Sequence, residues 1–165
     1  MASILGMTHA CSSAEPGVEI DGLSFSEQFL VWSIRAWVDG YKAGTGRAGL
    51  LREGFALAGA ADGWLLVEEL MTIVATSAKR PLDVRCLACK TLGVDEAPLL
   101  SAIAGLQREV DAPAIAACED WLPPSAARVA LKLLGRLARE LGRAGMRLPA
   151  SAQARIPDRG LALVH

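Results

Sequence analysis

Apolar residues recur at helical spacing along most of the chain. The first such segment begins at Ser24-Phe25-Ser26-Glu27, which fits a capping box, and extends to about Ala43, where Gly44 predicts its end. This segment holds most of the aromatic residues of the protein. Its wide apolar face carries Phe25, Phe29, Leu30, Trp32, Ile34, Trp37 and Tyr41. We therefore expect this helix to lie at the centre of the core.

The same periodicity predicts five further helices, and no segment shows the alternation of a strand. The predicted ranges are 47–60, 63–78, 95–108, 111–121 and 126–144. Asp62, Asp95 and Asp111 stand where N-cap residues are expected. The segment 82–93 has no clear period and is predicted to be a loop or a short helix. The short connections indicate an all-α fold, a compact bundle of about six helices.

The ends of the chain lack this pattern. Residues 1–22 mix Ser, Gly, Pro and acidic residues, so we expect a flexible arm over 1–22, a helical domain over 23–148 and a flexible tail over 149–165. Helix faces predict burial of the following side chains: Phe29, Trp32, Trp37, Leu66, Leu70, Ile73, Ile103, Leu137 and Leu141.

Composition narrows the class of protein. With 52 % apolar residues among 165, the chain is not wholly disordered, and a 5 % aromatic content favours helix over sheet. No apolar run reaches the roughly 20 residues that a spanning helix needs, so an integral membrane protein is excluded. The first residues have no basic segment of an export signal, so we expect a cytoplasmic protein. Its cysteines are then thiols or metal ligands rather than structural disulfides.

Charge is divided unevenly along the chain. Residues 1–120 hold 9 basic and 16 acidic residues (net -7), whereas residues 121–165 hold 8 basic and 2 acidic residues (net +6). Five cations of the last predicted helix fall within about 80° of one another on its surface, opposite a leucine face. They are Arg128, Lys132, Arg136, Arg139 and Arg143, and we call them the basic stripe.

Two interpretations of the basic stripe remain open. It is either an anion-binding surface or an ordinary solvated helix face that is partly paired with the acidic part of the same molecule. The net charge of -1 argues against a dedicated nucleic-acid partner. No aromatic residue is interleaved with the arginines, which leaves a base-stacking site unsupported.

The only chemical motif in the chain is Cys86-Leu87-Ala88-Cys89. Two thiols at this spacing can hold zinc or another soft metal, or cycle between dithiol and disulfide, and they can also simply fill core space. A metal site would need Cys118 as a third ligand and Cys11 or His9 as a fourth. The flanking charges of Arg85 and Lys90 would favour the thiolate form.

The Cys86-x-x-Cys89 tetrapeptide is similar to the motif of the all-α alkylhydroperoxidase-D and carboxymuconolactone-decarboxylase group. In that group a histidine follows the second cysteine at a short interval. Here Lys90, Thr91, Leu92 and Gly93 follow it, and no histidine occurs between His9 and His165. The resemblance therefore does not extend to the peroxidase activity of that group.

Catalysis of the Ser-His-Asp or Cys-His type is nearly excluded, because the only histidines stand near the two ends of the chain. We therefore expect a small helical interaction or regulatory protein that is non-catalytic and self-associating, most simply as a homodimer. The expected self-association rests on the large fraction of apolar residues and the four tryptophans, because surplus apolar surface tends to form interfaces. The alternatives are a thiol-based redox or metal-sensing protein using Cys86, Cys89 and Cys118, and an anion-binding module using the basic stripe.

Overall fold

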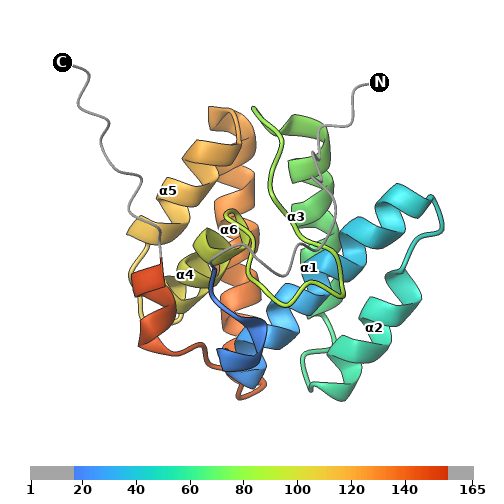
Figure 1. Ribbon diagram of the computed structural model, residues 1–165. Helices are drawn as coiled ribbons and strands as arrows, with labels where there is room; N and C mark the ends of the chain where they lie inside the picture. The colour runs from blue at the N-terminus through green and yellow to red at the C-terminus, as the bar shows by residue number, and fades with distance from the viewer. Residues whose placement is uncertain (1–16, 156–165) are drawn as a thin grey trace.

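The computed structural model of the chain describes residues 17–155, of which 67 % are helical. Six α-helices and two short 3-10 helices follow one another in this part: η1 (Ile20–Gly22), α1 (Phe25–Ala43), α2 (Ala48–Leu57), α3 (Gly63–Ser77), α4 (Glu96–Leu106), α5 (Ala112–Trp121), α6 (Pro124–Arg143) and η2 (Ala150–Arg155). No strand occurs in the described range, where Glu19 and Thr91 form an isolated antiparallel bridge. The predicted all-α bundle is confirmed (Figure 1).

The ends of α1 follow directly from local sequence. The Ser24 backbone N–H donates to Glu27 Oε2 at 2.8 Å, and the Glu27 N–H donates to Ser24 Oγ at 3.4 Å, which completes the predicted capping box. Gly44 ends the helix with φ of 66°, a left-handed conformation that glycine adopts without steric cost. Asp62, Asp95 and Asp111 also stand at N-caps as predicted, but none forms a side-chain cap hydrogen bond.

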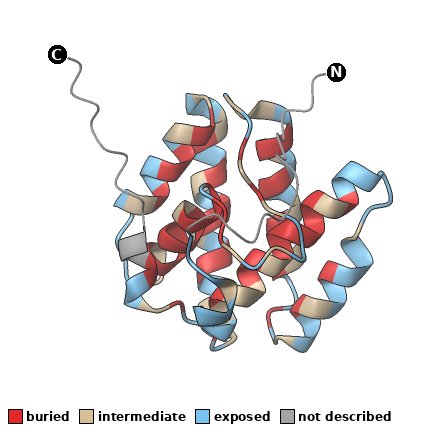
Figure 2. Ribbon diagram, in the orientation of Figure 1, coloured by how far each residue is buried: buried red, intermediate tan, exposed pale blue. Residues whose placement is uncertain are grey.

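The centre of the molecule is α4, not α1 as the aromatic content predicted. Helix α4 packs against α1, α5, α6 and η2, and nine of its eleven residues are buried. Figure 2 shows it as buried ribbon in the middle of the bundle. The physical reason is its small side chains: alanine, serine and glycine residues let neighbouring helices approach from several directions at once.

Helix α1 packs against α2, α3 and α4 and runs across the bundle toward α2, which lies at the edge (Figure 1). Phe29 and Trp32, which were predicted to be buried, are half-buried because they lie at the margin of the core, where Trp32 packs against Gly54 and Phe29 packs against Phe55 of α2. Phe25 is 71 % exposed. Ile73 is also half-buried, which corrects a third expected core position. The other six expected core residues are buried: Trp37, Leu66, Leu70, Ile103, Leu137 and Leu141.

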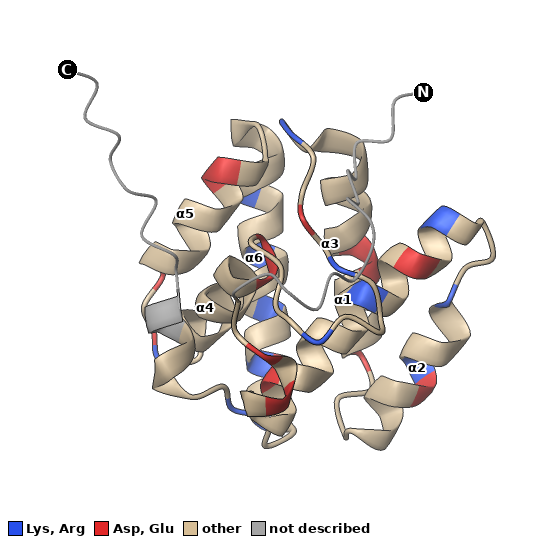
Figure 3. Ribbon diagram, viewed as in Figure 1, with Lys and Arg blue, Asp and Glu red and all other residues tan. Residues whose placement is uncertain are grey.

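Helix α6 has the two-faced character that its sequence predicted. Its apolar face is buried against α3, α4 and α5, through Ala127, Ala130, Leu133, Leu134, Leu137, Ala138 and Leu141. Its other face carries the basic stripe, which is exposed throughout (Figure 3). None of the described helices is long and apolar enough to cross a membrane.

Ordered structure extends beyond the domain limits expected from the sequence. Residues 17–22 lie along the loop before α4, where Ile20 N donates to Lys90 O at 2.7 Å and Leu92 N donates to Val18 O at 2.8 Å. At the other end, η2 packs on α4 and buries Ala152. Short hydrogen-bonded segments of this kind have no periodicity that a sequence reveals. The remaining residues of the expected arm and tail, 1–16 and 156–165, lie outside the described residues.

Candidate functional site

The two cysteines of the CxxC motif stand on an exposed turn in the long loop between α3 and α4. Cys89 N donates to Cys86 O at 3.1 Å, which closes a four-residue turn with Leu87 and Ala88 at its tip. The two Sγ atoms lie 2.8 Å apart. Cys86 is exposed, whereas Cys89 is half-buried and disulfide-bonded, which corrects the expectation that the cysteines form no disulfide. The sequence left a loop or a short helix open here, and the structure shows a turn.

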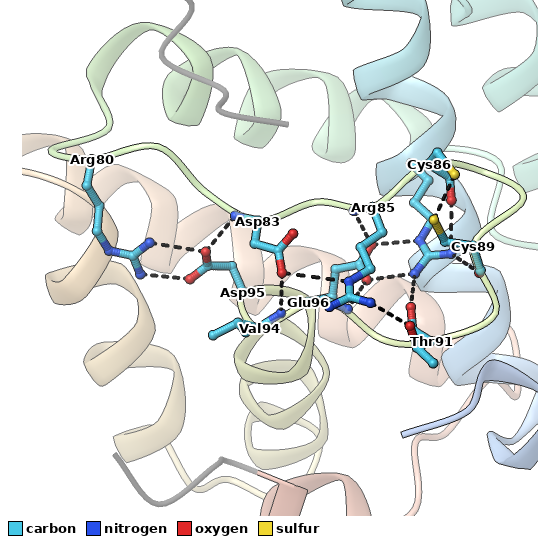
Figure 4. Close-up of polar contacts among 11 residues, drawn as sticks. Arg80, Asp83, Arg85, Cys86, Cys89, Thr91, Val94, Asp95 and Glu96 are labelled. Atoms are coloured by element: carbon cyan, nitrogen blue, oxygen red, sulfur yellow. Dashed lines mark hydrogen bonds and ion pairs between the residues drawn. The ribbon is translucent and has the colours of Figure 1, made fainter. Parts of the chain in front are cut away.

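A buried arginine of α1, Arg35, donates hydrogen bonds to the backbone of this turn. Arg35 Nη1 donates to Cys86 O at 3.1 Å and to Cys89 O at 2.7 Å, and Nη2 donates to Thr91 O at 2.9 Å. Three carbonyls of one loop thus accept from one guanidinium. Its planar, forked donors fix the directions of these bonds, so the backbone of the turn is set by a rigid group of the helix core. Figure 4 shows Cys86, Cys89 and Thr91 gathered at one end of the loop network.

Glu96, the first residue of α4, supplies the counter-charge to Arg35. Arg35 Nε donates to Glu96 Oε1 at 2.7 Å and Nη2 donates to Oε2 at 2.8 Å, a bidentate pair with side-chain exposures of 3 % and 1 %. The Glu96 carboxylate also accepts from the backbone N–H groups of Gly93 at 2.6 Å and Arg85 at 3.3 Å. Both buried charges are therefore paired and extensively hydrogen-bonded.

The other end of the loop is anchored by a second buried carboxylate. Asp95 accepts from Arg80 Nη2 at 2.7 Å, from Asp83 N at 2.7 Å and from Trp121 Nε1 at 3.2 Å. The Asp95 side chain forms these bonds instead of the N-cap hydrogen bond that the sequence predicts for it. The hydrogen bond to Asp95 raises the pKa of Arg80 above its ordinary value, so the guanidinium stays charged. Hydrogen bonds and ion pairs thus hold both ends of the loop that carries the turn.

The two cations next to the motif differ in their contacts. Arg85 Nη1 donates to Thr91 Oγ1, and its Nε lies 3.8 Å from Asp83 Oδ2. Lys90 is exposed. The cation bonded to the turn is Arg35, which sequence reasoning missed because it lies 51 residues away from Cys86. One signal was available: Arg35 is the only charged residue between Glu27 and Asp39, in a mainly apolar run where an arginine needs a partner.

Cys118 lies apart from this chemistry. It is 2 % exposed in α5, and burial raises the pKa of its thiol to about 11, with a smaller contribution from Glu119. Among the described residues, no three Cys, His, Asp or Glu side chains are grouped to hold a metal ion, so Cys86, Cys89 and Cys118 do not form such a group. The other suggested ligands, His9 and Cys11, lie outside the described residues.

The basic stripe is a second candidate site, far from the first in the sequence. Only Arg143 forms an ion pair within the described part of the chain, with Glu140. The other four cations have no carboxylate within ion-pair distance there: Arg128, Lys132, Arg136 and Arg139. Glu140 belongs to α6 itself, so among the described residues no cation of the stripe forms an ion pair with the acidic residues of 1–120.

Comparison with known proteins adds no assignment to either site. The chain matches no protein-family model, no curated protein sequence and no solved structure.

Proposed function

We propose that the protein carries out thiol–disulfide exchange, with Cys86 and Cys89 as the reacting pair. The observation that carries this proposal is the 2.8 Å between their sulfurs on an exposed turn. Cys89 is disulfide-bonded in the structure, so Cys86 Sγ lies beside one sulfur of an existing disulfide. A bond between Cys86 and Cys89 would need a sulfur shift of only about 0.8 Å to reach the usual S–S distance of about 2.05 Å. Because Arg35 fixes the backbone of the turn through the carbonyls of both cysteines, the two redox states can share one backbone.

The exposure of the two cysteines assigns their roles. The reaction begins once small cellular thiols such as glutathione have reduced the disulfide of Cys89 and have themselves been oxidised. Cys86, the exposed residue, then attacks one sulfur of a substrate disulfide as a thiolate; a mixed disulfide forms, the substrate S–S bond breaks, and the departing thiolate takes a proton from water. Cys89, the half-buried residue, then attacks Cys86 Sγ as a thiolate and releases the second substrate thiolate, which is protonated in turn. The chain loses two electrons and two protons, and the substrate disulfide gains them.

The cytoplasmic location expected from the sequence is part of this proposal. In a reducing compartment, the pair is kept as a dithiol and is oxidised only while it acts on a substrate or reports on oxidation. Cys118 takes no part, because a thiol with a pKa of about 11 is almost fully protonated at neutral pH.

The test is to reduce the full-length protein with dithiothreitol, remove the reductant, incubate the protein with oxidised glutathione and map the products by mass spectrometry. We expect the wild-type protein to form a disulfide between Cys86 and Cys89. Cys89→Ser should stop the reaction at a mixed disulfide of glutathione with Cys86, because the resolving residue is missing. Cys86→Ser should react far more slowly, because the exposed attacking sulfur is gone.

Two cysteine variants serve as matched controls. Cys118→Ala and Cys11→Ser each remove a sulfur but leave the pair intact, and both should still form the disulfide between Cys86 and Cys89. The proposal is wrong if Cys89 joins Cys11 rather than Cys86, or if Cys89→Ser accumulates no mixed disulfide.

Self-association is a second candidate function, supported by exposed apolar side chains on α1 and α2. Phe25 is 71 % exposed and Leu57 is 90 % exposed. Phe25 stacks on Phe29, whose ring meets Phe55 of α2 edge-on, with centroids 6.2 Å and 4.9 Å apart, so an aromatic row leads from the surface into the α1–α2 contact. Surface rows of this kind are typical of protein interfaces.

If this row is a homodimer interface, light scattering should give a mass near twice the 17.3 kDa of one chain. Phe25→Glu should shift the mass to that of a monomer, because it places a charge in the interface. Glu53→Lys, an exposed change on α2, is the control and should leave the mass unchanged. A wild-type protein that stays monomeric at high concentration would remove this candidate.

A further inference from the structure

A cleft of about 330 Å³ opens between α5 and α6. Its floor is apolar, formed by Leu122, Ala127 and Leu131, and Ile115 contributes a side chain that is 39 % exposed. Lys79 and Arg128 stand at its rim together with one acidic residue, Glu119. The cleft has the size and lining of a pocket for one or two apolar side chains.

The basic stripe begins at the rim of this cleft. Arg128 belongs to both, and the next three cations, Lys132, Arg136 and Arg139, continue along the same exposed side of α6. These are also the four cations that lack an ion pair among the described residues. An apolar pocket is thus continuous with a row of positive charge that the described part of the molecule does not neutralise.

We propose that this surface binds an acidic, amphipathic segment of a partner protein. An apolar side chain of the segment would fill the cleft, and its carboxylates would lie along the basic stripe. From Arg128 to Arg139 the helix rises about 16 Å, which corresponds to three turns of a bound helix or about five residues of an extended strand. The segment is therefore short.

Two other anionic partners fit this surface less well. A helix that binds a membrane surface inserts its apolar face, but the apolar face of α6 is buried in the core of the protein. A nucleic acid offers phosphates and no apolar anchor for the cleft, and the net charge of -1 opposes a long polyanion. Carboxylates interspersed with apolar side chains match both parts of the surface.

The test is fluorescence anisotropy with a labelled synthetic peptide that places leucines on one face of a helix and glutamates on the other face. The full-length protein should bind this peptide, and binding should weaken as salt rises. The double variant Arg128→Glu/Arg136→Glu should bind about tenfold or more weakly with little change in thermal midpoint, because exposed charges contribute little to stability. Ile115→Ser should also weaken binding, through loss of the apolar anchor.

Arg52→Glu, an exposed charge reversal on α2, is the matched control and should bind like the wild type. A peptide with lysine in place of glutamate should not bind. The proposal is overturned if the double variant binds the acidic peptide as tightly as the wild type. It is also overturned if the wild type binds anionic phospholipid vesicles or duplex DNA but not the acidic peptide.

Discussion

Arg35→Met should lower the free energy of unfolding by about 3–5 kcal/mol, the usual cost of leaving one member of a buried ion pair alone. The variant keeps an unbranched stem of the side chain but leaves the Glu96 carboxylate, 1 % exposed, without its counter-charge. It also removes the donor to the carbonyls of Cys86, Cys89 and Thr91. Urea unfolding followed by far-UV circular dichroism measures the change.

Two further variants show whether charge is the cause. Adding Glu96→Gln to Arg35→Met should recover part of the loss, because the amide oxygen still accepts from Gly93 N while no buried charge remains. Arg143→Met is the matched control: it breaks an ion pair in which the arginine is 73 % exposed, and it should cost no more than about 1 kcal/mol. Equal losses for Arg35→Met and Arg143→Met would contradict the structural role given to Arg35.

Ile103→Ala should cost about 2–5 kcal/mol, the range observed when a large buried side chain is truncated. Ile103 is fully buried in α4, the helix that contacts four other elements. Truncation should leave a cavity in the core, and the cost of this cavity adds to the loss of the buried side chain.

Leu57→Ala is the control for this truncation. Leu57 is 90 % exposed at the end of α2, so its loss should change the free energy of unfolding by no more than about 0.5 kcal/mol. Thermal unfolding followed by calorimetry compares the two variants. A loss for Ile103→Ala that is as small as that of Leu57→Ala would show that α4 is not the centre of the core.

Features set by neighbouring residues were predictable from the sequence. The capping box at Ser24, the left-handed end at Gly44 and the two faces of α6 all depend on contacts within one helix. Such contacts have the fixed spacing of the helix itself, and that spacing is visible in the chain. The sequence also pointed to Cys86 and Cys89 by their spacing alone, although it left open whether they form a redox pair, hold a metal or fill the core.

Everything that depends on contacts between distant segments was decided by the tertiary structure. Aromatic content predicted α1 at the centre, but packing depends on which helix can be approached from several sides, and the small residues of α4 allow this. Arg35 and Glu96 meet across 61 residues, and no local pattern links them. The same holds for the Asp95 contacts to Arg80 and Trp121, and for the cleft beside Arg128. The sequence by itself determined the helices and the candidate thiols, whereas only the tertiary structure decided which charge supports the thiols, because side-chain pairing across helices depends on how whole helices pack.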